Sequence, residues 1–588
     1  MTTCQNVTKA QEMLQNRNKN RIKGYIMPQT QPNWTFFAYF YTGKHKTLYR
    51  MKKIIITAIM SLLGLSVHAQ ISELVRQGNV TQLMHGGKPF IILGGELANS
   101  SASSSDYMDQ RDTWNYLAES GVNTVLAPVY WEMTEPEEGR FDFSSVDYLL
   151  KSARANGQKL IILWFGTWKN SMSCYVPSWV KRGFGKEFEL AKNSDGNVPE
   201  IMSAFSERNV RADAKAFAAL MKYLKKADSS EGTVLMVQVE NEIGMLGDAR
   251  DHSRLAQNAY NSPVPYEMIY MLTSGKANEH IYNVWNAAGK ATEGSWKEVF
   301  GAGIEADEIF MAYWYAKYTE RVAAAGKAEY DIPMFVNTAL NSRGRKAGDY
   351  PSAGPLAHLM PVWKMAAPSI DLICPDIYDK GFASWVSQYA AEDNQLFVPE
   401  VRQEPENGAR VFYVLGHHAG IGFSPFSIDN MPEDKDYPLK KAYKLLTPAL
   451  DLIAEKQAEG KTYGVLTDID NKETTLTING IDFKCRHDLT LGWNPEAGDP
   501  AKWGETSIMI MDMGNDTYLF MGTGVVTTMS PANGKGRVGI ERIDEVVFDD
   551  YGNMKKLRRL NGDEDHQGRH IRIPFGEYGA QLLKVYRY

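Results

Sequence analysis

A short segment from Thr233 to Gly244 ends a run of buried-type residues with three polar side chains. The sequence there reads TVLMVQVENEIG: a run of seven residues, apolar or β-branched except for Gln238, and then Glu240, Asn241 and Glu242 in succession. Burying a carboxylate is costly unless something pairs with it. We therefore expect these side chains to lie where a strand opens onto a cavity.

A second carboxylate occupies a similar position further along the chain, where LFVPEVRQ places Glu400 after an apolar run and Pro399. Two such carboxyl groups could share one reaction: one donates a proton to a leaving oxygen, and the other attacks or stabilises the cationic carbon. Each raises the pKa of the other and burial adds to the shift, so one stays protonated near neutral pH. We predict that Glu242 and Glu400 are the catalytic pair. A structural salt bridge is the alternative for either residue alone.

The elements that must position this pair form an alternating series. Continuous apolar strands separated by helical patterns are typical of a parallel sheet covered on both faces. Eight of them over about 370 residues favour a (β/α)8 TIM barrel over an open sheet. The glycine pattern G-x-G-x-x-G of a dinucleotide fold does not follow the first strand. The eight predicted strands lie at 89–97, 123–131, 159–168, 233–244, 333–339, 371–378, 395–400 and 420–426.

This arrangement explains why the acidic residues stand where they do. Active sites of barrels gather at the C-terminal ends of the strands; Glu242 follows the fourth predicted strand and Glu400 ends the seventh. Successive side chains on a strand point to opposite faces, so we predict that Glu240 supports the site without taking part in the chemistry.

Two domains are predicted for the α/β chain, because the pattern of apolar and polar residues changes near residue 460. A (β/α)8 barrel is expected over 75–459, with its last helix around 439–458. From 460 to 588 apolar and polar residues alternate between Asn-Gly and other Gly-rich turns, which indicates a C-terminal antiparallel β-sandwich domain. We expect this domain to pack beside the barrel and to add no catalytic residue.

The motifs also resemble a known family. VQVENEIG is similar to the acid/base motif of glycoside hydrolase family 35, the β-galactosidases, and the segment WEMTEPEEGRFDF (131–143) resembles one shared with family 42. The resemblance covers about 80–455, and the C-terminal part is similar to a β domain of a bacterial subgroup. It implies that Glu242 is the acid/base, that Glu400 is the nucleophile and that Asn241 holds the sugar 2-hydroxyl. It also implies a terminal β-linked galactose as substrate, as in plant cell-wall side chains.

Other predicted sugar contacts lie at strand ends. Aromatic faces suit the apolar C–H patches of a sugar ring. We predict that Trp131, Trp168 and Tyr378 provide such faces. Lys169 and Asn170 are the polar partners; many family members carry Ala-Glu there. An Arg at 402 and the lack of His-Tyr after the first strand's Gly-Glu are further departures in the region that contacts the sugar.

Composition and the N-terminal region set the remaining expectations. A net charge of −6 over 588 residues excludes a strongly basic nucleic-acid-binding protein. MKKIIITAIMSLLGLSVHAQ (51–70) has the form of a signal peptide cleaved after Ala69, so we expect a periplasmic or secreted protein and a non-native or disordered extension at 1–50. No membrane span in the mature protein, no cofactor and no metal are predicted; His417 and His418 lack a third ligand at suitable spacing.

Three functions therefore remain open at this point. The first is a retaining exo-β-galactosidase, and the second is an endo-β-glycanase of the same clan. The third is a non-catalytic exported glycan-binding protein, which the presence of both carboxylates disfavours. An insertion at about 250–300, rich in Tyr and Trp, could wall off an exo-type pocket.

Overall fold

The computed structural model describes residues 71–342, 344–391 and 393–588. These residues fall within one compact unit. The predicted signal peptide and the first 50 residues lie outside the described residues. Within those residues no helix is both long and apolar enough to cross a membrane.

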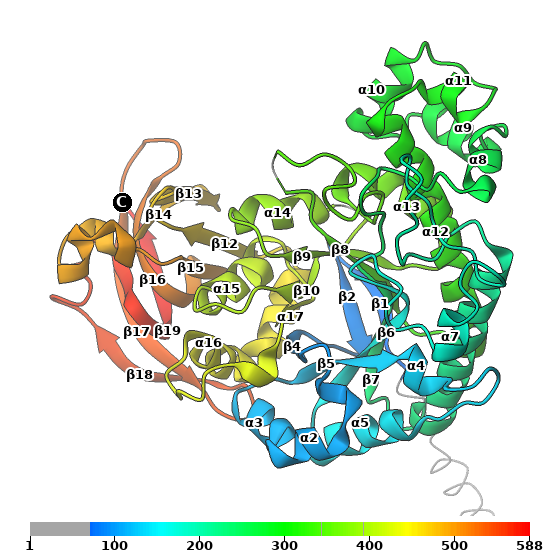
Figure 1. Ribbon diagram of the computed structural model, residues 1–588. Helices are drawn as coiled ribbons and strands as arrows, with labels where there is room; N and C mark the ends of the chain where they lie inside the picture. Colours follow the sequence, from blue (N-terminus) through cyan, green and yellow to red (C-terminus); the bar gives the residue numbers. More distant parts are fainter. Residues whose placement is uncertain (1–70, 343, 392) are drawn as a thin grey trace, which may run out of the picture. The chain divides into compact units, whose positions relative to one another are not determined.

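Eight parallel strands close into a barrel, which confirms the predicted TIM barrel (Figure 1). Each strand coincides with one of the eight predicted apolar runs. Around the barrel they follow the order β10-β11-β4-β5-β6-β7-β8-β9. Their bounds are β4 Ile92–Glu96, β5 Thr124–Tyr130, β6 Lys159–Lys169, β7 Val234–Asn241, β8 Met334–Ala339, β9 Leu372–Ile377, β10 Phe397–Val401 and β11 Gly422–Pro425.

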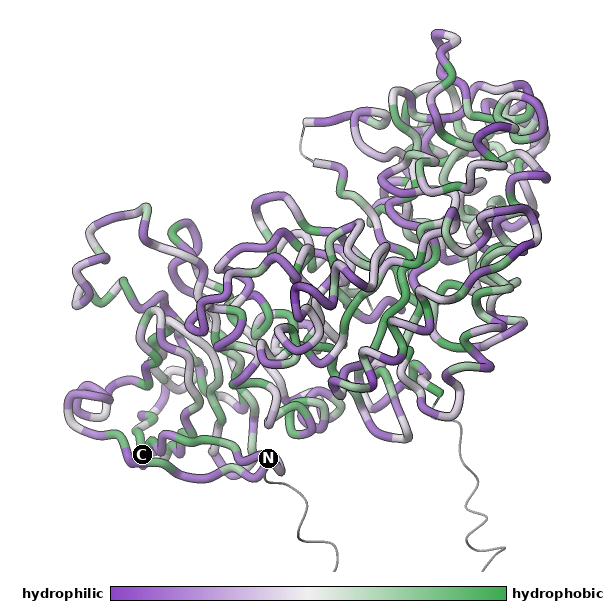
Figure 2. The backbone as a smooth tube through the Cα atoms, turned by 60° about the horizontal axis from the view of Figure 1, so that its bottom comes forward, coloured by the Kyte–Doolittle hydropathy of each residue, from purple (hydrophilic) through white to green (hydrophobic). Residues whose placement is uncertain are grey.

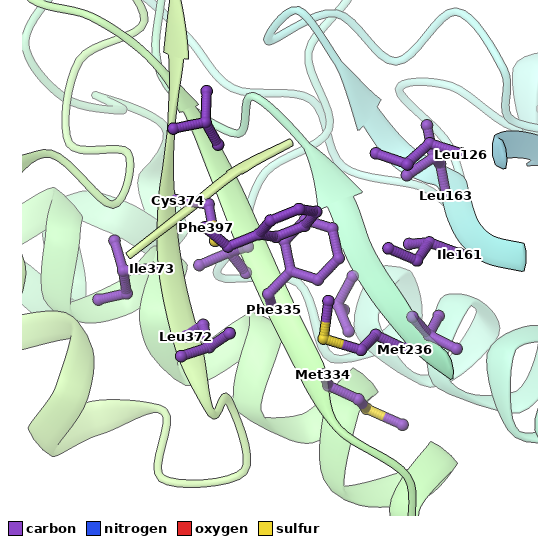
Figure 3. Packing of buried hydrophobic residues seen from close by; sticks show 14 of the residues in the cluster. Leu126, Ile161, Leu163, Met236, Met334, Phe335, Leu372, Ile373, Cys374 and Phe397 are labelled. Atoms are coloured by element: carbon purple, nitrogen blue, oxygen red, sulfur yellow. The ribbon is translucent and has the colours of Figure 1, made fainter. Parts of the chain in front are cut away.

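The interior of the barrel is filled by apolar side chains from these strands. Figure 3 shows Phe335 and Phe397 facing each other at its centre, and their rings meet edge to face with centroids 5.4 Å apart. The barrel closes where β11 pairs with β4, and a Cβ atom at Gly422 would lie only 2.5 Å from the Cβ of Ile92. Hydrophobic stretches of the backbone accordingly concentrate on the barrel strands in Figure 2.

Helices follow the strands, as the alternating pattern predicts. The helix expected around 439–458 is two helices, because Pro448 interrupts it at a 3₁₀ turn, Thr447–Ala449. The bounds are α2 Ser105–Gln110, α3 Thr113–Glu119, α4 Trp131–Thr134, α5 Ser144–Ala155, α6 Ser178–Lys181, α7 Glu207–Asp228, α8 Arg254–Tyr260, α9 Tyr266–Thr273, α10 Glu279–Ala287, α11 Trp296–Phe300, α12 Ile304–Glu329, α13 Met360–Ala366, α14 Phe382–Tyr389, α15 Asn407–His417, α16 Pro438–Leu446 and α17 Leu450–Ala458.

Two antiparallel sheets complete the described residues. The small one, β1–β3, precedes the barrel. The large one follows it and has eight strands, which confirms the predicted C-terminal antiparallel β domain. The long strand β16 pairs with both β14 and β15, and its register with β19 shifts between Thr523 and Val525. The bounds are β1 Glu73–Gln77, β2 Val80–His85, β3 Lys88–Pro89, β12 Thr462–Thr467, β13 Glu473–Ile478, β14 Ile481–His487, β15 Thr506–Gly514, β16 Thr517–Pro531, β17 Val538–Phe548, β18 Met554–Leu560 and β19 Ile571–Arg587.

Candidate active site

The C-terminal ends of five barrel strands bring polar side chains to one mouth. Glu96 ends β4, Lys169 ends β6, Asn241 ends β7 and Glu400 lies in β10. Strand register fixes their relative heights, because Lys169 pairs with Asn241 and Glu400 pairs with Asp376 of β9. All five side chains are at most 5 % exposed. The mouth is therefore a buried polar site in a barrel whose strands are mostly apolar.

Glu242 enters this site because the backbone departs from regular strand geometry. Glu240 and Glu242 have φ angles of 62° and 46°, a left-handed conformation that is uncommon for residues other than glycine. Glu240 faces away from the mouth, where its Oε2 accepts from the Trp168 backbone N–H at 2.8 Å. The backbone N–H of Glu242 donates to Oδ1 of Asn337 at 3.0 Å. Glu240 is thus a supporting residue, as predicted.

The environment of Glu242 favours its protonated form. Burial raises the pKa of this carboxyl from its ordinary value of 4.5 to about 7, and the nearby charge of Glu400 acts in the same direction. Lys169 and a hydrogen bond from the Asn170 side chain to Oε2 oppose the shift. A carboxyl with this pKa can hold a proton near neutral pH and release it during a reaction.

Glu400 has a different set of neighbours. The Tyr378 hydroxyl donates a hydrogen bond to its Oε1. Burial, followed by the charge of Glu400, raises the pKa of Tyr378 well above its ordinary value, so the phenol remains a donor. Arg402 lies over the Tyr378 ring, with its Cζ 5.3 Å from the ring centroid, and donates to the Tyr378 carbonyl at 3.2 Å. Tyr378 therefore holds the Glu400 carboxylate directly, and Arg402 in turn holds Tyr378.

The two predicted catalytic carboxyls lie close together. One oxygen each of Glu242, Asp376 and Glu400 lie within 4.8 Å of one another. In the part of the chain that the structure describes, this is the one group of three such side chains close enough to hold a metal ion, and its oxygen donors would suit a hard cation. Protons can neutralise the same cluster, since burial raises the pKa of Asp376 well above its ordinary value and Glu400 adds to that shift.

Lys169 supplies positive charge among these acids. Burial alone would lower its pKa, but the carboxyl groups of Glu400, Glu242, Glu96 and Asp376 outweigh burial and raise it. Its Nζ lies 5.0 Å from the centroid of the Phe165 ring. The buried amine therefore stays charged and offsets part of the negative charge of the site.

Asn241 is fully buried, and neither its Oδ1 nor its Nδ2 has a hydrogen-bond partner among the described residues. An unpaired buried polar atom costs about 1–3 kcal/mol. Such an amide is available to a ligand that donates and accepts hydrogen bonds. The structure places the side chains of Asn241, Asn170, Lys169 and Tyr378 at the mouth together with Glu242 and Glu400, the predicted catalytic pair.

The structure corrects the prediction that Trp131 and Trp168 contact the sugar. Both indole rings are completely buried. Trp131 packs against Trp164 and donates from its ring nitrogen to Glu135 at 2.9 Å. Trp168 packs edge to face against Tyr318 of α12 with centroids 4.6 Å apart. Both rings are thus packed among other aromatic side chains and stabilise the barrel.

Sequence reasoning missed Glu96 and Asp376. Both are buried acids at the ends of predicted strands, Glu96 in GGE and Asp376 in CPDIY. The same signal that identified Glu400, a carboxylate ending an apolar run, could have found them. Burial, and then the charge of Glu400, raises the pKa of Glu96 well above its ordinary value.

Parts of this sequence match known proteins. Residues 82–312 match the family described as glycosyl hydrolases family 35, and residues 439–572 match a domain of unknown function, DUF5597. A β-galactosidase of Xanthomonas manihotis is 30% identical over 187 residues, which are 30% of this chain and 27% of that protein. The chain thus spans about a quarter of the length of this curated relative.

Solved structures with similar folds include two β-galactosidases. The enzyme of the psychrophilic Marinomonas ef1 has a TM-score of 0.43 and 12% identity, covering 63% of this chain and 62% of that one. The enzyme of the haloarchaeon Halorubrum lacusprofundi has a TM-score of 0.42 and 13% identity, covering 61% and 58%. The family match includes Glu242 and ends before Glu400. The resemblance to glycosyl hydrolases of family 35 is thus confirmed, over residues 82–312 of this chain.

Proposed function

We propose that this chain is a retaining exo-glycoside hydrolase that releases terminal β-linked galactose, for example from plant cell-wall side chains. Glu400 is the nucleophile and Glu242 the general acid/base. The observation that carries the proposal is the close approach of these two carboxyls, with oxygens within 4.8 Å, at the ends of the fourth and seventh barrel strands. Retaining glycosidases hold their carboxyl groups roughly 5–5.5 Å apart, whereas inverting ones leave room for a water molecule.

The surroundings of the two carboxyls suit different steps of a double displacement. In the first step Glu400 attacks the anomeric carbon while Glu242 gives its proton to the leaving glycosidic oxygen. Formation of the glycosyl ester removes the charge of Glu400, which is one of the causes that raise the pKa of Glu242. Glu242 is then a stronger acid that remains ionised, and it can accept a proton from the water that attacks the ester.

Neighbouring side chains keep these roles apart. The Tyr378 hydroxyl holds one oxygen of Glu400 and leaves its Oε2 without a partner among the described residues. That oxygen is the one available for attack. Asn170 fixes the Glu242 carboxyl by a hydrogen bond to Oε2, and Asn241 offers an uncharged amide to the sugar 2-hydroxyl.

An exo mode of attack agrees with the insertion after β7. Helices α8–α11 occupy residues 254–300 and follow the C-terminal end of that strand, the end at which the site lies. The chain there can enclose one end of the substrate. An endo-β-glycanase of the same clan is the second candidate, and it would release internal fragments from a polymer where the proposed enzyme releases single galactose units.

Azide rescue of two variants tests the mechanism. With a nitrophenyl β-galactoside and Glu400→Ala, azide should attack from the vacated face and give an α-galactosyl azide. With Glu242→Ala the activated leaving group still departs without an acid, so azide should intercept the glycosyl-enzyme and give the β-product.

Two results would overturn the proposal. Identical azide products from both variants would mean that the roles are wrongly assigned. α-Galactose as the first product from a β-galactoside would rule out double displacement. A panel of nitrophenyl glycosides measured with the unaltered enzyme tests the substrate, because turnover of a β-glucoside or β-mannoside with none of the β-galactoside would exclude galactose specificity.

We also propose that the protein is exported and cleaved after Ala69. The support is the sequence of residues 51–69, which has two lysines, an apolar run and a small residue at the cleavage site. Mass spectrometry of the mature protein from the periplasm or medium should find Gln70 at the N-terminus. Mature material that retains residues 1–50 would contradict this.

A further inference from the structure

Two buried acids at the barrel mouth have no part in the proposed double displacement. Glu96 ends β4 and Asp376 lies in β9, so they reach the site from different sides of the barrel. Both are at most 1 % exposed. Acids so completely buried require a compensating interaction.

The Glu96 carboxyl meets no hydrogen-bond donor among the described residues. Its side-chain hydrogen bond is to another acid, Glu400, and it forms only when a proton is shared between them. Its charged neighbours are Glu400, Glu242 and Lys169. Burial and the charge of Glu400 raise its pKa well above the ordinary value, which favours the protonated form, and a protonated carboxyl can both donate and accept a hydrogen bond.

Asp376 is only half satisfied. Its Oδ2 accepts from the Asn337 side chain at 2.6 Å, whereas Oδ1 has no partner among the described residues. The same Asn337 accepts from the backbone N–H of Glu242 at 3.0 Å. One amide therefore fixes Asp376 relative to the acid/base, and an oxygen of Asp376 lies within 4.8 Å of both catalytic carboxyls.

A purely structural acid in the same protein looks different. Asp251 is also fully buried, but its two oxygens accept from the Lys192 backbone N–H at 3.0 Å, from the Ser203 hydroxyl at 2.6 Å and from Ser253. Burial by itself is thus compatible with full pairing. At the mouth, the unpaired oxygens of Glu96 and Asp376 lie beside the predicted catalytic carboxyls, where a ligand could reach them.

We propose that Glu96 and Asp376 bind hydroxyl groups of the sugar ring held between Glu242 and Glu400, and that they determine which sugar the site accepts. This assignment rests on the proposed function. Asn241 is expected to take the 2-hydroxyl, so the two acids contact other hydroxyls. Because they approach from β4 and β9, on either side of β10 in the barrel, they contact different ones.

Monodeoxy substrates combined with variants test this assignment. Wild-type kcat/KM is measured on a nitrophenyl β-galactoside and on analogues in which each ring hydroxyl is replaced in turn by hydrogen. A site built to bind a hydroxyl rejects the analogue that lacks it by about 10⁴-fold. In Asp376→Ala that penalty should fall to less than about tenfold at one position and persist at the others, since the interaction is already lost. Glu96→Ala should do the same at a different position.

The conservative variants Asp376→Asn and Glu96→Gln keep a hydrogen-bonding side chain of the same size. They should restore part of the discrimination, and they serve for the measurement if the alanine variants do not fold. Asp251→Asn is the matched control for loss of a buried acid, and it should leave every deoxy penalty unchanged. Circular dichroism checks that each variant is folded.

The outcomes separate this inference from the function on which it rests. Full deoxy penalties retained in folded Asp376 and Glu96 variants, with an active wild-type enzyme, would overturn the hydroxyl-binding role alone. A uniform loss of kcat across all analogues would also overturn it, because that result indicates a purely structural role. Absence of wild-type turnover on every nitrophenyl glycoside would instead remove the proposed function, and this inference with it.

Discussion

Two carboxyls of this protein are almost equally buried and yet behave in opposite ways. Glu308 of α12 is 3 % exposed and Glu242 at the barrel mouth is 5 % exposed. Glu308 accepts hydrogen bonds from the Tyr350 hydroxyl at 2.9 Å, the Ala353 N–H at 3.2 Å and the His358 ring nitrogen at 3.1 Å. Glu242 has one amide donor on its carboxyl and acids around it.

The pKa values of the two groups move in opposite directions as a result. Burial pushes up the pKa of both carboxyls. At Glu308 the hydrogen bonds and charge of His358, with the other donors, outweigh burial and lower the pKa. At Glu242 the charge of Glu400 adds to burial and the pKa rises to about 7. Burial alone therefore does not fix the direction of the pKa shift; the hydrogen-bond donors and charges around each carboxyl decide it.

Activity should show the largest difference between the two regions. Glu400→Gln removes the proposed nucleophile, and kcat should fall on the order of 10⁴-fold or more. Glu308→Gln alters an acid that takes no part in the chemistry, and its kcat in the folded protein should stay within about threefold of wild type. Steady-state hydrolysis of a nitrophenyl β-galactoside measures both. Equal losses in the two folded variants would contradict the division into catalytic and structural acids.

The loss of stability should be larger in Glu308→Gln than in Glu400→Gln, the reverse of the order expected for activity. Glu308→Gln leaves buried donors facing an amide, and breaking a buried, paired charge costs about 3–5 kcal/mol of unfolding free energy. Urea unfolding provides the measurement. The exposed Glu305 on the same helix supplies the control, since Glu305→Gln should change stability by no more than about 0.5 kcal/mol. A Glu308 variant as stable as wild type would mean that its hydrogen bonds contribute little.

The barrel was predictable from the sequence because its signal is local. A strand buried on both faces needs a continuous apolar run, and each of the eight runs became a barrel strand. Glu242 and Glu400 were predictable for the same reason, since a charge at the end of such a run needs a special environment. The prediction of a single helix at 439–458 was wrong, because the effect of Pro448 on that helix was overlooked.

Which aromatic residues belong to the site could not be predicted in this way, because a position at the end of a strand does not determine where the side chain packs. Trp131 follows β5 as Tyr378 follows β9, and Trp168 lies at the end of β6. The two tryptophan rings are fully buried, whereas the Tyr378 hydroxyl reaches Glu400. Which side of the barrel wall a ring occupies depends on partners far away in sequence, such as Tyr318 for Trp168. The left-handed conformations at Glu240 and Glu242 are equally hidden from local propensity, because tertiary contacts hold them.

The pH dependence of stability should separate the two acids further. The pKa of Glu242 rises from 4.5 to about 7 on folding, so the folded state holds a proton that the unfolded chain has released over this interval. Its contribution is fully present below about pH 4.5 and is lost as pH rises through about 7, a change of about 3 kcal/mol. Glu308 has a lowered pKa, so its contribution is present above the unfolded pKa and is lost as pH falls.

Unfolding free energies across this pH range, for wild type and Glu242→Gln, measure the effect. The glutamine cannot release a proton, so the difference between wild type and the variant should decline from about pH 4.5 to about pH 7 and then remain constant. A difference that rises with pH would mean that the Glu242 pKa is lowered in the folded protein.

The smallest expected effect concerns Lys169, the positive charge among the acids of the barrel mouth. Its positive charge opposes the rise in the Glu242 pKa. Lys169→Met keeps the apolar stem near Phe165 and removes the charge, so the pKa of Glu242 should rise above about 7. The acid then stays protonated to higher pH, and the basic limb of the kcat/KM profile should move upward.

Two further variants isolate the charge as the cause. Lys169→Arg keeps a cation at this position and should leave the basic limb close to its wild-type pH. Lys181→Met removes the charge of a half-buried lysine that lies 3.7 Å from Glu132, outside the carboxyl cluster, and should not move the limb. A basic limb that stays in place or moves downward in Lys169→Met would show that Lys169 does not act on the acid/base. Its buried amine would then be a binding group for the substrate, and the loss would appear in KM without a change in the pH profile.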